Sequence, residues 1–206
     1  MKNLKLMSML LGGLLALGSL SSCGSDNDDE EPLPEVMKPT SATAEYVVTL
    51  GQGLLDVANV TIYYIDSKGE QAQETVTSTN WTKTVNFATL PAKTGFSVQP
   101  VLKGQPSQEE YTIVASGQIK ITVLDQKGGT FGTPYVSNLK ELKGLLGPDF
   151  IGQFMTRISI RLMESKAISA DGSIADTAIT WGGNADNDDP NRDTSISTEG
   201  ATGETR

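Results

Sequence analysis

The chain has 206 residues, and its 16 basic and 25 acidic side chains give a formal charge of -9. It contains one cysteine and no histidine, which excludes Ser-His and Cys-His nucleophile pairs, histidine-ligated metals, multi-cysteine zinc sites and an internal disulfide. An acidic chain also lacks the basic face that nucleic-acid binding needs, so no nucleic-acid partner is expected. The length suits one domain with a hydrophobic core.

Residues 1–22 have the pattern of a secretory signal peptide. Lys2 and Lys5 form a short positive segment, and residues 6–20 are almost entirely apolar. A helix over residues 6–20 would rise only about 22 Å, which is less than the roughly 30 Å of a bilayer's hydrocarbon core. The segment is therefore predicted to be a signal peptide and not a membrane span.

A lipidation motif follows at once, in the order Leu20, Ser21, Ser22 and Cys23. It resembles the lipobox of bacterial lipoproteins, in which a signal peptidase cuts before the cysteine and the cysteine then carries acyl chains such as palmitate. The resemblance implies that Cys23 anchors the protein to a membrane. Each buried CH₂ contributes about 0.8 kcal/mol, so two or three acyl chains would anchor the protein stably in a membrane, whereas a single myristoyl chain binds only marginally. The alternative is a secreted protein that is cleaved elsewhere and keeps a free thiol.

An acidic run comes directly after the cysteine and includes Ser25, Asp26, Asp28, Asp29 and Glu30. It resembles the export signal that sends Bacteroidetes lipoproteins to the outer face of the outer membrane. The resemblance implies an outer-membrane protein that faces the cell exterior and is held there by acyl chains. The alternative is a solvated acidic spacer. In both cases residues 23–42 are predicted to form a disordered tether.

Residues 43–181 are predicted to form an antiparallel β-sandwich. Short runs of alternating or β-branched residues between turn residues indicate about eight or nine strands. An immunoglobulin-like arrangement of two sheets fits best, and a closed barrel is the alternative. The expected strands cover residues 45–50, 57–65, 75–79, 81–87, 96–102, 111–115, 119–124, 154–163 and 174–181.

Glycine and proline give local detail within this pattern. Asp66 to Gly69 and Asp171-Gly172 are predicted turns, because glycine allows a positive φ. Ser116-Gly117 is expected to separate two strands. Pro100 should place its strand at a sheet edge, because proline cannot donate a ladder hydrogen bond.

One segment breaks the strand pattern and is predicted to be a short helix across one end of the sandwich. Its leucines have helical spacing, and Gly147-Pro148 would end it. The expected helical residues are Leu139, Leu142, Leu145 and Leu146, with Asn138 and Glu141 as a capping box.

Residues 182–206 contain a single large apolar residue, Ile196, and are predicted to be disordered. The run at 184–189 offers oxygen ligands at alternate positions, but it lacks the glycine and the distal glutamate of an EF-hand loop. No metal site and no cofactor is therefore expected. Asp176-Thr177-Ala178 also resembles the short acceptor motif of Bacteroidetes O-glycosylation.

Aromatic side chains are the candidate ligand-binding residues. Trp81, Trp181, Tyr63 and Tyr111 would form a stacking platform for sugar rings if they faced solvent, and core residues if they did not. No catalytic residue is predicted. A carboxylate-only glycoside hydrolase stays open as an alternative, and it would need two carboxylates about 5–10 Å apart in a cleft.

These observations favour a surface-exposed, lipid-anchored binding module that is not an enzyme. The expected ligand is a glycan or a host or cell-surface protein. The chain resembles small Bacteroidetes lipoproteins of unassigned function. The alternative is a structural or fimbria-associated assembly component, which would expose a sheet edge or groove that accepts a strand from another chain.

Overall fold

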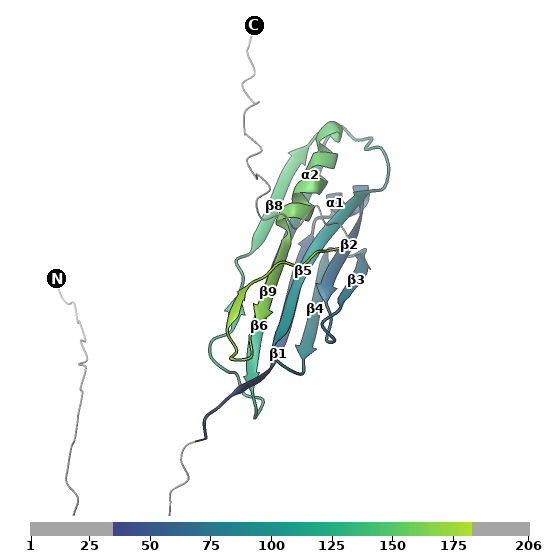
Figure 1. Ribbon diagram of the computed structural model, residues 1–206. Helices are drawn as coiled ribbons and strands as arrows, with labels where there is room; N and C mark the ends of the chain where they lie inside the picture. The colour runs from purple at the N-terminus through teal and green to yellow at the C-terminus, as the bar shows by residue number, and fades with distance from the viewer. Residues whose placement is uncertain (1–34, 183–206) are drawn as a thin grey trace, which may run out of the picture. The chain divides into compact units, whose positions relative to one another are not determined.

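The computed structural model describes residues 35–182, which form two antiparallel sheets (Figure 1). The predicted antiparallel β-sandwich is therefore confirmed. The signal peptide, the lipobox with Cys23, the acidic run and all of the predicted tail after Gly182 lie outside the described residues. In chain order the elements are β1 (Pro39–Leu50), α1 (Gln52–Val57), β2 (Ala58–Ile65), β3 (Gln71–Val76), β4 (Asn80–Phe87), β5 (Ala92–Leu102), β6 (Tyr111–Asp125), β7 (Tyr135–Val136), β8 (Lys140–Leu146), α2 (Pro148–Arg161), β9 (Met163–Ile168) and β10 (Ile174–Asp176).

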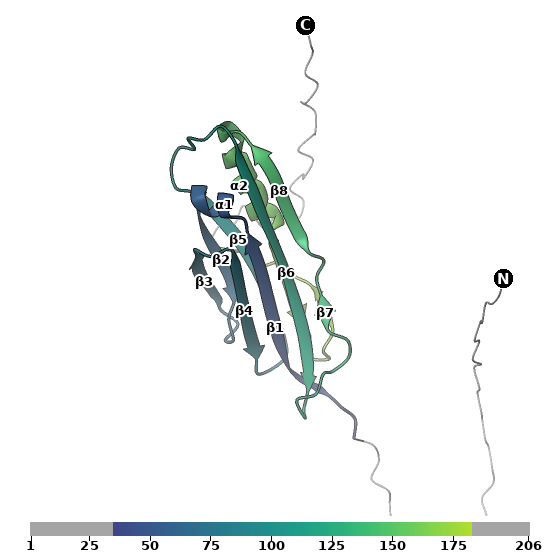
Figure 2. The same cartoon turned by 180° about the vertical axis from the view of Figure 1, so that it is seen from behind.

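Each sheet has five strands. Sheet A has the order β4-β1-β6, and β7 and β8 both pair with β6. Figure 2 shows this sheet with β1 between β4 and β6. Sheet B has the order β10-β9-β5-β2-β3. Neither sheet closes on itself within the described residues, so the alternative of a closed barrel is wrong.

The core lies between the sheets because the strands alternate apolar and polar side chains. Alternate residues of β1 from Ala42 to Leu50 are buried, and so are alternate residues of β6 from Tyr111 to Asp125. The two strands pair over their whole common length, with Tyr46 opposite Ile119. Sheet A thus presents one continuous apolar face to sheet B.

Tyr46 is a polar group inside this core. Its hydroxyl lies 2.6 Å from Thr94 Oγ1 and donates to the Ile65 carbonyl at 3.3 Å. The rings of Tyr64, Trp81 and Phe96 each lie 6.3 Å from the Tyr46 ring, centroid to centroid. Burial raises the pKa of Tyr46 to about 12, so the hydroxyl stays neutral at physiological pH.

The predictions on the two sides of Gly147-Pro148 are both wrong. Residues 140–146, expected as a helix, form strand β8, and residues 148–161 form helix α2 where a strand was expected over 154–163. Pro148 stands in the first turn of α2, where its missing N–H costs nothing. The short apolar run in this region is compatible with the period of a strand and with that of a helix. In the structure it is helical, and the buried side chains of α2 are Ile151, Phe154, Met155 and Ile158.

Strand pairing decides the conformation of β8. Residues 140–146 pair with 111–117 of β6, and Leu142 and Leu146 pack against the core. Gly144 lies between them on the same side, and a Cβ there would be 3.0 Å from the ring of Phe154. The helical leucine spacing is therefore overridden by pairing with a neighbouring strand, which a local pattern does not report.

Gly117 does not separate two strands as predicted. β6 runs without a break from Tyr111 to Asp125, and Gly117 pairs with Val48 on one side and Lys140 on the other. A Cβ at this position would lie 2.7 Å from Phe96 Cε2. The glycine makes room for a core ring and is not a turn residue.

Pro100 does not place its strand at a sheet edge, because β5 pairs with both β2 and β9. The pairing with β9 ends at Ser97, however, and Pro100 pairs only with Val60 of β2. Beyond Ser97, helix α2 and not a strand lies beside β5 on this side. Val98 N donates to the carbonyl of Leu162, which caps α2, at 3.0 Å. The proline thus stands where β5 has a strand on one side alone.

Both predicted turns are confirmed. Gly69 has φ +79° and Gly172 has φ +83°. The sandwich begins at Pro39, so residues 39–42 belong to β1 and not to the predicted tether. At the other end β10 stops at Asp176, and the expected last strand over 174–181 is correspondingly shorter.

Residues 177–182 instead form a strap across the outer face of sheet B (Figure 1). Thr177 N donates to the Ser165 carbonyl of β9. Farther along, Gln71 of β3 donates to the Thr180 carbonyl at 2.8 Å and accepts from Gly182 N at 2.8 Å. The strap therefore connects opposite sides of sheet B.

Candidate functional site

Trp81 belongs to the core and is not an exposed platform residue. It is 7% exposed, and its Nε1 donates to Glu74 Oε2 at 2.8 Å. Lys83 Nζ and the Tyr64 hydroxyl donate to Glu74 Oε1 at 2.6 and 3.1 Å. Because Glu74 comes from β3 and Trp81 from β4, this cluster connects an edge of sheet B to an edge of sheet A.

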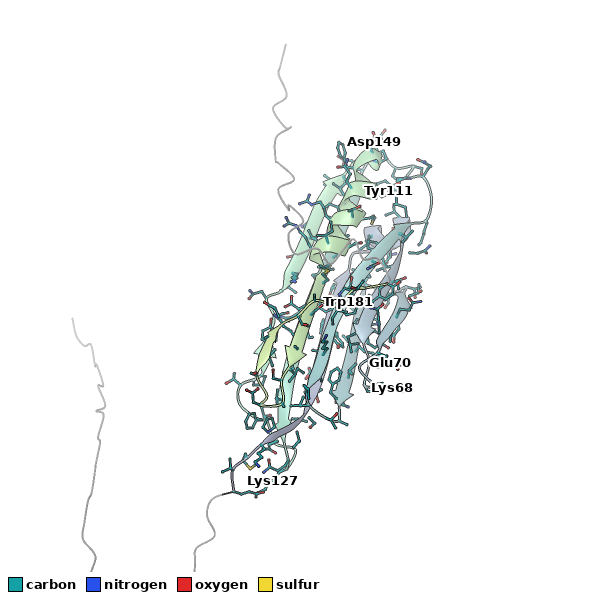
Figure 3. All side chains as sticks on the ribbon, viewed as in Figure 1. Lys68, Glu70, Tyr111, Lys127, Asp149 and Trp181 are labelled. Carbon is teal, nitrogen blue, oxygen red and sulfur yellow. The ribbon has the colours of Figure 1, made fainter. Side chains whose placement is uncertain are left out.

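Trp181 is also buried, at 1% exposure, and it lies over β5 (Figure 3). The indole packs where Gly95 has no side chain, because a Cβ on Gly95 would lie 3.1 Å from Trp181 Cζ2. Tyr63 is half-buried, and its ring approaches Gly182 at the end of the strap. The predicted exposed stacking platform of Trp81, Trp181 and Tyr63 is therefore wrong.

Tyr111 is the fourth predicted aromatic residue, and it is 6% exposed at the start of β6. Its ring is not available for stacking, but it lines a cavity of about 290 Å³. The cavity lies between the end of α1 and the loop that joins β5 to β6. Of the four predicted aromatic residues, Tyr111 is therefore the one that lines a cavity, but its side chain is buried.

Charged side chains of β9 and β10 in sheet B also contact β8, at the free edge of sheet A. Glu164 of β9 bonds Lys166 Nζ at 2.9 Å, forms an ion pair with Lys140 of β8 and accepts from the Tyr135 hydroxyl at 3.3 Å. Lys166 also pairs with Asp176, and its Nζ lies 4.7 Å from the Tyr135 ring centroid. The Glu164 and Lys166 side chains are only 12% and 9% exposed.

The pKa values of these groups follow from the contacts. Burial alone would raise the pKa of Glu164, but hydrogen bonds from Lys140 and Lys166 hold it below its usual value. Burial alone would lower the pKa of Lys166, but its hydrogen bonds to Asp176, Tyr135 and Glu164 raise it above its usual value. The Glu164 and Lys166 charges stay fixed near neutral pH, so the cluster suits a structural role better than proton transfer.

A groove of about 610 Å³ lies beside this cluster, between β8 and the end of α2. Its lining combines apolar side chains with both charges. The lining residues of this β8–α2 groove are Leu139, Lys140, Glu141, Leu142, Ile160 and Arg161. Arg161 and the nearby Lys143 form no ion pair with any residue between 35 and 182.

β8 is a free edge of sheet A in the described part of the chain, because it pairs with β6 alone. Exposed apolar side chains concentrate along this edge. Four of the eight large hydrophobic residues exposed in the described part lie between residues 136 and 150, namely Val136, Leu139, Leu145 and Phe150. Such a concentration is typical of an interaction surface.

Comparisons with known proteins give no guide. No protein-family model matches the chain, and no curated protein matches it. A function can therefore be proposed only from the geometry of the molecule, namely from the two cavities and the free edge of β8.

Metal-ligating and carboxylate side chains are sparse at the two cavities. No group of three metal-ligating side chains occurs in residues 35–182, and each of the two cavities has one carboxylate in its lining, Asp56 in one and Glu141 in the other. No helix in this part of the chain is long and apolar enough to cross a membrane. The alternative of a two-carboxylate hydrolase finds no carboxylate pair in either cavity.

The β8–α2 groove was missed at the sequence level. Leu139 and Leu145 were assigned to a helix, so no free strand was expected beside them. The available signal was the run Lys140 to Lys143, in which three of four residues are charged, because charged residues and lysine above all are typical of exposed edge strands.

Proposed function

We propose that this protein is a lipid-anchored, non-catalytic module that binds a partner protein on the outside of the outer membrane. Cys23 carries the acyl chains, and the sandwich presents its binding edge to the surroundings. The free edge of β8, with exposed apolar side chains beside the β8–α2 groove, is the observation that carries the proposal. The bound segment adds to sheet A as a further strand.

The chemistry of the edge defines the partner segment. The unpaired backbone groups of β8 need an extended chain, and Leu142 and Ile160 favour apolar side chains on the face of that chain that lies toward the β8–α2 groove. Arg161 at the groove and Lys143 on the opposite, exposed face of β8 lack an ion-pair partner in the described part, and both favour acidic side chains. The occupant is therefore an extended acidic segment with alternating apolar residues.

Charged residues on β8 also limit which strands can add. Lysine on an edge strand discourages pairing with arbitrary chains, because a buried unpaired ammonium is costly. An acidic partner removes that penalty, so the same residues select among partners. A structural or fimbria-associated role uses the same docking chemistry, with the strand supplied by another subunit.

A peptide experiment tests strand addition directly. The full chain in detergent micelles is mixed with a soluble peptide of alternating glutamate and valine, and backbone hydrogen exchange is measured. We expect exchange to slow within residues 140–146, with binding that weakens as salt rises. Arg161→Glu should weaken binding by about three- to tenfold, because an attractive contact becomes repulsive.

Two controls keep that result specific. Lys68→Glu reverses a charge in the exposed turn before β3 and should leave peptide binding unchanged. A peptide of alternating lysine and valine should bind less well than the acidic one. Unchanged exchange in β8, or equal effects of Arg161→Glu and Lys68→Glu, would contradict the proposal.

The anchor has its own test. In cells fed an alkyne-labelled fatty acid, the wild-type chain should become labelled and Cys23→Ser should lose all labelling, because no other cysteine exists. The wild-type protein should fractionate with the outer membrane and be removed by protease added to intact cells. Labelling that persists in Cys23→Ser would overturn the anchor.

A further inference from the structure

The cavity beside Tyr111 has polar groups that the β8 edge does not use. It is formed by the end of α1, which supplies Asp56, and by the β5–β6 loop, which supplies Lys103, Gln105 and Gln108. Tyr111 lies at the other end of that loop, as its label in Figure 3 shows. The cavity belongs to a different part of the sandwich from the β8–α2 groove, since none of its lining residues is shared.

The hydroxyl of Tyr111 is the key group. Its oxygen accepts hydrogen bonds from the backbone N–H groups of Ser107 at 2.8 Å and Gln108 at 2.7 Å. These two bonds use both lone pairs, so the hydroxyl hydrogen remains to be donated. No residue between 35 and 182 accepts it, although Tyr111 is only 6% exposed. A buried donor needs an acceptor, and the cavity is where one can reach it.

The other cavity groups offer both donors and acceptors. Lys103 Nζ donates to the Leu55 carbonyl and keeps further N–H groups. Asp56 Oδ1 accepts from Gln52 Nε2 at 2.8 Å, which leaves Oδ2 as an acceptor. The side-chain amides of Gln105 and Gln108 can donate and accept.

We propose that this cavity binds a small, neutral, polyhydroxylated ligand, such as a single sugar unit. A sugar oxygen accepts from the Tyr111 hydroxyl, and neighbouring sugar hydroxyls bond Asp56 and the two glutamines. The ligand is neutral because one ammonium and one carboxylate in the lining balance each other. It is small because about 290 Å³ is at the low end of ligand pockets.

Hydrogen bonds dominate this site, since the Tyr111 ring is buried and cannot stack on a sugar. We therefore expect weak binding to a single unit, with dissociation constants of about a millimolar. The site is independent of strand addition at β8, and a polysaccharide chain could present the unit repeatedly.

Saturation-transfer NMR of the full chain in micelles tests the site with free glucose, galactose, mannose and N-acetylglucosamine as probes. At least one should receive saturation, and Gln108→Ala and Tyr111→Phe should each weaken its binding by about three- to tenfold. Gln108→Ala changes an exposed side chain, so it keeps the test valid if Tyr111→Phe loosens the loop.

Matched controls separate this site from the rest of the surface. Gln73→Ala removes an exposed glutamine of β3 and should leave sugar binding unchanged, as should Arg161→Glu at the β8–α2 groove. The proposal is overturned if no probe receives saturation, because water then satisfies Tyr111. It is equally overturned if Gln108→Ala behaves as Gln73→Ala does.

Discussion

Replacing Trp181 by alanine should lower the free energy of unfolding by about 3–5 kcal/mol. The side chain is 1% exposed, and it fills the space that Gly95 leaves on the outer face of sheet B. Its loss leaves a cavity under the strap, and the strap's hydrogen bonds to Gln71 of β3 lose their support. For a domain of this size, the melting temperature should fall by about 10 °C.

Urea unfolding followed by far-UV circular dichroism measures this effect. Leu145→Ala is a suitable control, because that side chain is 65% exposed and its removal should change stability by less than about 0.5 kcal/mol. Trp181→Phe keeps an aromatic ring and should fall between the two. Equal stability of the Trp181→Ala and Leu145→Ala proteins would mean that the strap does not unfold with the sandwich.

Glu164→Ala should have the second largest effect, a loss of about 3 kcal/mol. Removing one partner of a buried ion pair usually costs 3–5 kcal/mol, and here Asp176 still neutralises part of the charge of Lys166. The variant also leaves Lys140 and the Tyr135 hydroxyl without their shared carboxylate. The contact between β8 and β9 should loosen, which denaturation and hydrogen exchange in residues 140–146 can both report.

The same variant should change the dependence of stability on pH. Hydrogen bonds from Lys140 and Lys166 hold the pKa of Glu164 below its unfolded value of 4.5, against the opposing effect of burial. A lowered carboxyl pKa stabilises the fold above that value, and the stabilisation is lost as pH falls through the folded-state pKa. Acidification below about pH 4.5 should therefore destabilise the wild type more than Glu164→Ala.

Lys166 gives the opposite dependence on the alkaline side. Its pKa is raised above the unfolded value of 10.5, so its contribution is complete below that pH and is lost as pH rises through the folded-state pKa. Glu141→Ala, on the exposed side of β8, is the matched control and should leave both pH dependences unchanged. Identical acid profiles of Glu164→Ala and the wild type would contradict the assigned role of the cluster.

Most strands could be predicted from sequence because their alternation reflects burial on one face. β1, β2, β4 and most of β5 were expected near their observed positions, and both glycine turns were recognised by their residue types. α1 was not predicted because it is only six residues long. Its Gly53 is required by a close approach to a residue that is distant in the sequence. A Cβ there would lie 2.3 Å from the Thr112 carbonyl oxygen.

The exchange of helix and strand has one physical cause, because a short apolar run is compatible with both the two-residue period of a strand and the 3.6-residue period of a helix. The segments on either side of Pro148 were exchanged between helix and strand, and only pairing with β6 and packing against β5 decide between them. The same uncertainty applied to aromatic residues, since sequence cannot tell whether an indole covers a glycine. Trp181 does so because Gly95, distant in sequence, leaves the space.

The position of β1 determines how the sandwich would respond to mechanical force. Under the proposed anchor at Cys23, a pull on a bound partner passes through β8, β6 and β1 to the tether, all within sheet A. β1 is paired over almost its whole length with β4 on one side and β6 on the other, so a pull along its axis loads both ladders in shear. Many hydrogen bonds must then break together, whereas a strand pulled across its axis peels away one bond at a time. Because β1 is paired on both sides, the proposed tether would join the sandwich at a strand that resists a pull along its axis.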